Sequence, residues 1–111
     1  MLDIEHKEKD LVTVVYFIGK IDTKTSPEAQ QYVNKLINQG VKNMVINFEK
    51  LDFISSTGLR VLLATGKQMK SINGELRVCN LNEIVQEVFD ISGFSIILNV
   101  FGNESEALDG F

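Results

Sequence analysis

Short apolar runs alternate with longer stretches of mixed polarity along the chain. Residues 2–5 and 11–18 predict two strands, and the second is rich in Val, Tyr, Phe and Ile, the residues that strands favour. A charged turn over residues 7–10 should join these two strands, and Gly19 should end the second. Three further strands are predicted: the apolar run 44–48, residues 75–78 after the Asn73-Gly74 turn, and residues 96–101.

Two segments between these runs repeat their apolar residues at helical spacing. Ser26 and Pro27 predict the start of the first helix, as its cap and its first helical residue, and Gly40 should stop it. Its inner face should hold Ala29, Tyr32, Val33, Leu36 and Ile37. The second helix should run over about residues 57–69.

The last third of the chain predicts two more helices. Asn82 should cap a third helix that ends at Gly93. The inner face of this helix should be formed by Ile84, Val88 and Phe89. Asn103, with Glu106 three residues later, resembles a capping box and predicts a brief terminal helix.

The elements therefore follow the order β-β-α-β-α-β-α-β, with a possible final helix. This order predicts an α/β fold: a mixed, mostly parallel sheet with helices packed on it, in which only the first two strands pair antiparallel. A length of 111 residues suits one core, so we expect residues 1–111 to form a single domain.

The charge and the composition disfavour several classes of function for this chain. The net charge of −4 disfavours nucleic acid as a partner, and no basic amphipathic stretch suggests binding to a membrane surface. The apolar runs are too short to span a bilayer, and the N-terminus lacks a signal-peptide pattern. The lone Cys79 suits a reducing compartment, so we expect a cytoplasmic protein.

Catalytic patterns are weak. His6 is the only histidine, and Cys79 falls at the end of a predicted strand, where a role as a small core residue is expected. Asp22, Glu49 and Asp52 fit solvated turns better than an acid/base pair. Metal-ligand spacing and a phosphate-binding loop are both missing from the sequence, so we expect no enzyme, metal or cofactor.

Three successive hydroxyl residues precede the second helix. Ser55, Ser56 and Thr57 stand directly before Gly58, although a helix start needs only one hydroxyl as its cap. One helix face should pack on the sheet: Leu59, Leu62, Leu63 and Gly66. The opposite face is small or apolar: Thr57, Val61, Ala64 and Gln68. It is either a docking stripe or an ordinary set of exposed apolar groups.

The stretch Asp52-Phe53-Ile54-Ser55-Ser56-Thr57-Gly58-Leu59 resembles the signature of STAS-domain anti-sigma-factor antagonists. Further matches to this family lie before and after it: Gly19-Lys20-Ile21-Asp22, Val45-Ile46-Asn47-Phe48 and Phe89-Asp90-Ile91-Ser92-Gly93-Phe94. The resemblance implies that Ser56 is a phosphoacceptor, with Asp22, Thr57 and Gly58 around it. Ser55 stands where the family usually has Asp, which makes Ser55 a possible alternative acceptor.

The resemblance also implies a partner-switching role. The unmodified protein would bind an anti-sigma factor that is a serine kinase, and so release a sigma factor. Phosphorylation would break that complex, with ATP supplied through the kinase, and a PP2C-type phosphatase would reset it. Arg60, Val61 and Ala64 are the expected partner contacts. The alternatives are a stand-alone STAS protein that acts as a scaffold or as a soluble component of a transport or lipid-trafficking system, and weak nucleotide binding.

Overall fold

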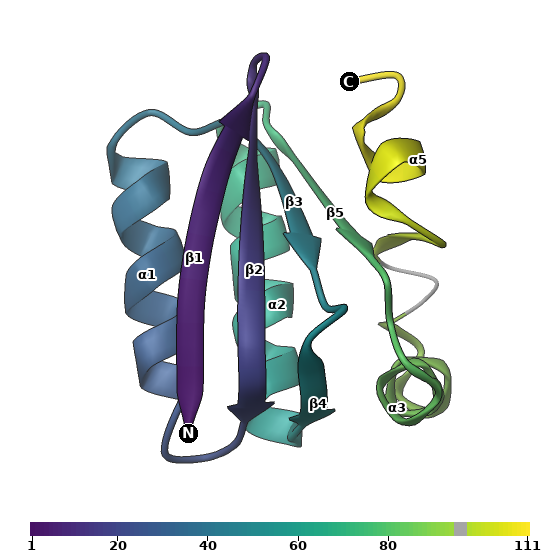
Figure 1. Ribbon diagram of the computed structural model, residues 1–111. Coiled ribbons are helices and arrows are strands. Elements are labelled where there is room, and N and C mark those ends of the chain that lie inside the picture. The colour runs from purple at the N-terminus through teal and green to yellow at the C-terminus, as the bar shows by residue number, and fades with distance from the viewer. Residues whose placement is uncertain (95–97) are drawn as a thin grey trace.

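The computed structural model describes residues 1–94 and 98–111, and Figure 1 shows their arrangement. The sheet has the order β1-β2-β3-β5-β6, and β4 pairs with β2 off this path. The pair β1–β2 is antiparallel, and the other pairs are parallel. The strands span Leu2–Lys9 (β1), Val12–Ile21 (β2), Asn43–Asn47 (β3), Leu51–Ile54 (β4), Glu75–Cys79 (β5) and Asn99–Phe101 (β6). The α/β fold class is confirmed.

Helices cover both faces of this sheet. The helices among the described residues are α1 (Ser26–Asn38), α2 (Ser56–Ser71), α3 (Glu83–Ser92) and α5 (Glu104–Leu108). Figure 1 shows α1 and α2 behind β1 and β2, and α5 beside β5. Alternate residues of β2 divide between two cores: Val15 and Phe17 join the main core, whereas Val12 and Val14 join a smaller core that includes Ala107 of α5.

The first hairpin is tighter than the sequence predicts. The residues expected to form a charged turn continue β1 as far as Lys9, and Asp10 and Leu11 alone connect the strands. Asp10 adopts φ 57°, a left-handed conformation that Asp tolerates. The prediction failed because β1 lies at the edge of the sheet, where exposed charged side chains are compatible with a strand.

Strand β4 is missing from the sequence prediction. It has four residues, of which Leu51 and Ile54 are buried and Asp52 and Phe53 are exposed, so its apolar pattern is short and interrupted. It pairs with the end of β2, which runs past the predicted stop at Gly19. The register shifts between Gly19 and Lys20, and φ of Gly19 is +108°, so this glycine marks a bulge rather than a strand end.

The helix ends are partly as predicted. Asn82 and Asn103 cap α3 and α5, and Gly93 ends α3 in the left-handed conformation with φ 78°. The predicted cap Ser26 is wrong, because its hydroxyl donates to the Asp22 carbonyl and Thr25 occupies the cap position.

Two features around α3 differ from the sequence prediction. The inner face of this helix includes Val85, which is fully buried, in place of Ile84, whose side chain is 59% exposed. The predicted last strand is described only from residue 98, and β6 starts at Asn99. Residues 96 and 97 of that prediction lie outside the described residues.

Candidate functional site

The start of α2 is fixed to the end of β2. The Ser55 amide donates to the Ile21 carbonyl at 2.8 Å, which holds the loop against the sheet. The Ser55 hydroxyl then accepts from the Gly58 amide at 3.2 Å and caps the helix. Of the three hydroxyls predicted here, that of Ser55 therefore caps the helix.

A second hydroxyl is held by the first. The Thr57 hydroxyl oxygen lies 2.7 Å from that of Ser55 and 3.1 Å from that of Ser26 on α1. This short chain of hydroxyls joins the start of α2 to the start of α1. Ser26 completes it and was not among the predicted site residues.

Ser56 is different from both neighbours. It is the first residue of α2, and it is exposed. Its hydroxyl makes no hydrogen bond to any other residue in the described part of the chain, whereas those of Ser55 and Thr57 are engaged. Within the described residues, Ser56 is thus the one member of the three that is exposed and has a hydroxyl without a hydrogen bond, and it is the residue that the motif singles out.

Asp22 shapes the loop that lies beside this cluster. Its Oδ1 accepts from the amides of Lys24 at 2.9 Å and Thr25 at 3.0 Å, and from the Thr25 hydroxyl at 3.2 Å. The bond from the Thr25 amide is the main cause that lowers the pKa of Asp22 below its ordinary value. Its carbonyl accepts from Ser26, so the Asp22 segment reaches the hydroxyl cluster through Ser26 and Thr57. Asp22 is therefore a fixed negative charge in an adjoining loop.

Gly58 permits the close packing under the cluster. A Cβ atom at this position would lie 2.6 Å from Ile21 Cγ2 and 2.7 Å from Ile54 Cγ1. Ile21 and Ile54 are the last residues of β2 and β4, and both are buried. Helix α2 can start this close to the ends of β2 and β4 only because residue 58 has no side chain.

The predicted docking stripe and the predicted partner contacts on α2 are only partly exposed. Arg60 and Ala64 are exposed, but Val61 is only 8% exposed, so its prediction as a partner contact is wrong. The physical reason is that α1 packs along this side of α2, with Val61 and Thr65 buried. The signal was available in the sequence: Thr57, Val61 and Thr65 repeat at four-residue spacing, as expected for a helix that contacts a second layer.

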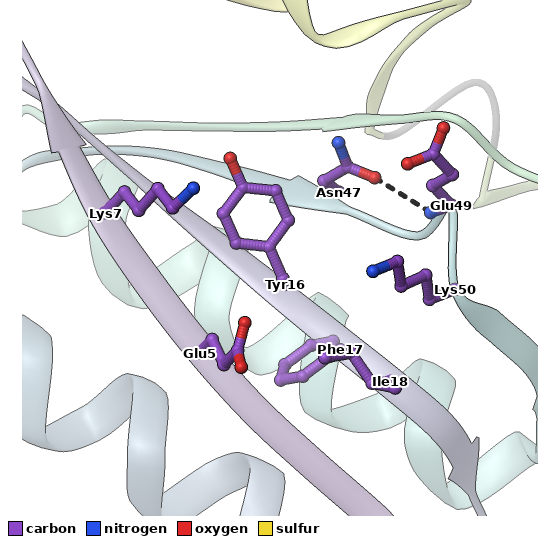
Figure 2. Close-up of a pocket in the computed structure, with 8 residues that line it drawn as sticks. All are labelled: Glu5, Lys7, Tyr16, Phe17, Ile18, Asn47, Glu49 and Lys50. Atoms are coloured by element: carbon purple, nitrogen blue, oxygen red, sulfur yellow. Dashed lines mark hydrogen bonds between the residues drawn. The ribbon is translucent and has the colours of Figure 1, made fainter.

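A small pocket of about 150 Å³ lies elsewhere, on the face of β2 that carries Tyr16. Its lining mixes polar and apolar side chains and carries both charge signs: Glu5, Lys7, Tyr16, Phe17, Ile18, Asn47, Glu49 and Lys50 (Figure 2). Asn47 Oδ1 accepts from the Glu49 amide at 2.8 Å, the bond drawn in Figure 2. Tyr16 donates to Glu104 of α5 at 2.7 Å, so Tyr16 and Asn47 both have hydrogen-bond partners within the chain.

Glu104 attaches α5 to the sheet beside this pocket. Its carboxylate accepts from Tyr16, from Asn47 at 3.1 Å, and from Lys9, with which it forms an ion pair. Partial burial of Glu104 acts to raise its pKa, but the bonds from Lys9, Tyr16 and Asn47 outweigh this and lower the pKa below the ordinary 4.5.

Replacing Glu104 with Gln should make stability less dependent on pH. A carboxylate with a lowered folded pKa stabilises the fold above pH 4.5, and this contribution is lost as the pH falls through the folded pKa. We expect Glu104→Gln to cost about 1 kcal/mol at neutral pH, and the difference from the unchanged protein to shrink in acid. Thermal unfolding at pH 7 and pH 3 checks this, with exposed Glu87→Gln as the control. An equal loss at both pH values would contradict it.

The other reactive groups among the described residues are not gathered into a site. In residues 1–94 and 98–111, no group of three or more His, Cys, Asp or Glu side chains is placed to hold a metal ion. Cys79 is fully buried, as predicted, and burial raises the pKa of its thiol to about 12. None of the described helices is long and apolar enough to cross a membrane.

The fold and the site together define a class: a single α/β domain that presents an accessible serine hydroxyl at the start of a sheet-packed helix. Residues 3–107 match the family model described as the STAS domain. The chain belongs to the STAS domain family, as the motif around Ser56 suggests.

Individual relatives agree with this assignment. BtrV of Bordetella bronchiseptica is 34% identical over 93 residues, which cover 84% of this chain and 80% of BtrV. The anti-sigma F factor antagonist of Paenibacillus polymyxa is 31% identical over 108 residues, 96% of this chain and 92% of the relative.

Solved structures show the same fold. The antagonist SpoIIAA in its unphosphorylated form superposes with a TM-score of 0.80 at 24% identity, covering 98% of this chain and 94% of SpoIIAA. The phosphorylated form of Bacillus SpoIIAA gives a TM-score of 0.72 at 23% identity, covering 98% and 97%.

Proposed function

We propose that this protein is an anti-sigma factor antagonist that binds an anti-sigma factor serine kinase and is switched off by phosphorylation at Ser56. The names of its relatives support the antagonist role. The observation that carries the switch is the state of the Ser56 hydroxyl, which is exposed and unengaged within the described residues while its two hydroxyl neighbours hold the structure.

The position of Ser56 makes phosphorylation compatible with the fold. A phosphate adds a charge of about −1.5 to −2 at neutral pH. At the start of a helix this charge faces unpaired backbone amides and gains roughly 0.3–1 kcal/mol. Because Ser56 Oγ has no partner among the described residues, the modification breaks no internal hydrogen bond. The domain should keep its structure in both states.

The same charge is unfavourable in a protein interface. A docked partner would strip water from the phosphate, and the nearby loop already holds the negative Asp22. Moving a complex from mostly bound to mostly free takes about 5.5 kcal/mol of differential affinity. The free-energy cost of burying a phosphate without a compensating cation is of this order.

Arg60 and Ala64 extend the proposed docking surface along α2. Both are exposed and lie one and two turns after Ser56. The kinase supplies ATP for the modification, and a PP2C-type phosphatase restores the binding form. These partners place the cycle in the cytoplasm.

Incubation with an anti-sigma factor serine kinase and ATP tests the acceptor. We expect one phosphate per chain by intact mass, mapped to Ser56, and none on Ser56→Ala. Ser55→Ala is the matched control: it loses the helix cap at a cost of about 1 kcal/mol, yet it should still be phosphorylated. A phosphate mapped to Ser55 or Thr57 would contradict the assignment.

A further inference from the structure

In the part of the chain that the structure describes, strand β1 has one edge without a partner strand. Within the described residues β1 pairs only with β2, and residues 5–9 are exposed. Lys9 and Val12 flank the two-residue connection, and such a pair is hydrogen-bonded in a hairpin. Hydrogen-bonded and non-hydrogen-bonded pairs alternate along an antiparallel ladder. The backbone N–H and C=O groups of the odd-numbered residues of β1 therefore point toward β2. The Met1 carbonyl accepts from the Lys20 amide, which is the inward bond expected for an odd-numbered residue.

The backbone groups of Ile4, His6 and Glu8 consequently point out from the sheet edge. The odd-numbered side chains share one face of the sheet. On this face the first half of β1 is acidic, with Asp3 and Glu5, and the second half is basic, with Lys7 and Lys9. A strand with this order of charges is complementary to itself when it is reversed.

We propose that the β1 edge pairs antiparallel with β1 of a second copy of this chain, with His6 opposite His6. In this register Glu5 lies opposite Lys7 of the second copy, and Asp3 lies opposite Lys9. These are non-hydrogen-bonded pairs, in which side chains approach most closely. The outward backbone groups of Ile4 and Glu8 meet each other in the same register, so hydrogen bonding and charge pairing agree.

The neighbouring registers do not share this agreement. A shift of two residues in one direction places Glu5 opposite Glu5, and a shift of two residues in the other places Lys7 opposite Lys7. Like charges directly opposite each other destabilise a strand pair. Charged side chains on an edge strand usually prevent association. On this edge their order instead favours one register and one partner strand, β1 of a second copy.

Helix α1 carries a matching pattern. Glu28, Tyr32 and Lys35 lie on one side of α1 at a spacing of four and three residues, and Tyr32 contacts His6 through its hydroxyl. A two-fold axis at His6 would therefore pass near Tyr32 and set the two α1 helices antiparallel. Glu28 and Lys35 flank Tyr32, so each would approach the opposite charge on the second copy.

Charge reversal at positions 5 and 7 tests this pairing. Sedimentation of the full chain over a concentration series should show a monomer–dimer equilibrium that weakens as salt is raised. Glu5→Lys and Lys7→Glu should each raise the dissociation constant roughly tenfold or more, because each turns attractive pairs into repulsive ones. Both positions are exposed, so circular dichroism should show an unchanged fold.

Two combinations separate strand pairing from other causes. An equimolar mixture of Glu5→Lys and Lys7→Glu should form a heterodimer, and the double variant Glu5→Lys/Lys7→Glu should dimerise like the unchanged protein. Glu87→Lys on α3 serves as a control for net charge and should have no such effect. A protein that stays monomeric at about 1 mM, a dimer insensitive to the single reversals, or a mixture that fails to associate would each overturn the proposal.

Discussion

Ser56→Asp should weaken binding to the anti-sigma factor kinase roughly 100-fold, the scale expected for an unpaired charge buried in an interface. The melting temperature should change by only a few degrees, because an acidic side chain is tolerated in the first turn of a helix. Calorimetric titration against the kinase and thermal unfolding of the same samples measure the two quantities. Charge at the helix start is therefore expected to act on binding and leave the fold intact.

Ser56→Asn is the matched control for this substitution. It has nearly the same shape as Asp without the charge, so it should bind almost as well as the unchanged protein. An equal loss for both variants would mean that side-chain size, rather than charge, blocks the partner. Arg60→Glu should also weaken binding, since Arg60 lies one turn away and is exposed.

Gly58→Ala should have the largest effect on stability. The added methyl group would lie within 2.7 Å of buried Ile21 and Ile54, and neither strand end can move without disturbing the sheet. Overpacking of this kind costs about 1–3 kcal/mol or more, which exceeds the gain in helix propensity of about 1 kcal/mol. We expect a net loss of about 2 kcal/mol and a fall in melting temperature of roughly 10 °C.

Gly66→Ala offers a control in the same helix. A Cβ atom there would lie 3.3 Å from Leu98 Cδ2 and 3.8 Å from Leu76 Cδ2, contacts that small side-chain movements relieve. The propensity gain is the same, so this variant should be neutral or slightly more stable. Equal stability of Gly58→Ala and Gly66→Ala would show that the contact with Ile21 and Ile54 does not limit the packing.

Local patterns predicted the parts of the fold whose signals are themselves local. The alternation of strands and helices, the caps at Asn82 and Asn103, and the stop at Gly93 depend on residues close together in the chain. Strand β4 was missed because it exists through pairing with β2, a contact about thirty residues distant, and its four residues include two exposed ones. Such a strand has no periodic signal of its own.

The sequence predicted which residues form the candidate site, but it did not predict the separate role of each. The motif singled out Ser55, Ser56 and Thr57 together, and only the three-dimensional contacts show that Ser55 caps the helix while Thr57 contacts Ser26. Val61 was misplaced because a helical wheel records one inner face, whereas α2 packs against both the sheet and α1. The phosphoacceptor role of Ser56 stays a prediction.

The most direct test is to compare the affinity of the kinase for two preparations of this protein, one unmodified and one fully phosphorylated, with thermal unfolding recorded for each. The account predicts tight binding of the unmodified form, a loss of roughly two orders of magnitude or more on phosphorylation, and nearly equal melting temperatures. Equal affinities, or a phosphorylated form that has lost its fold, would contradict it.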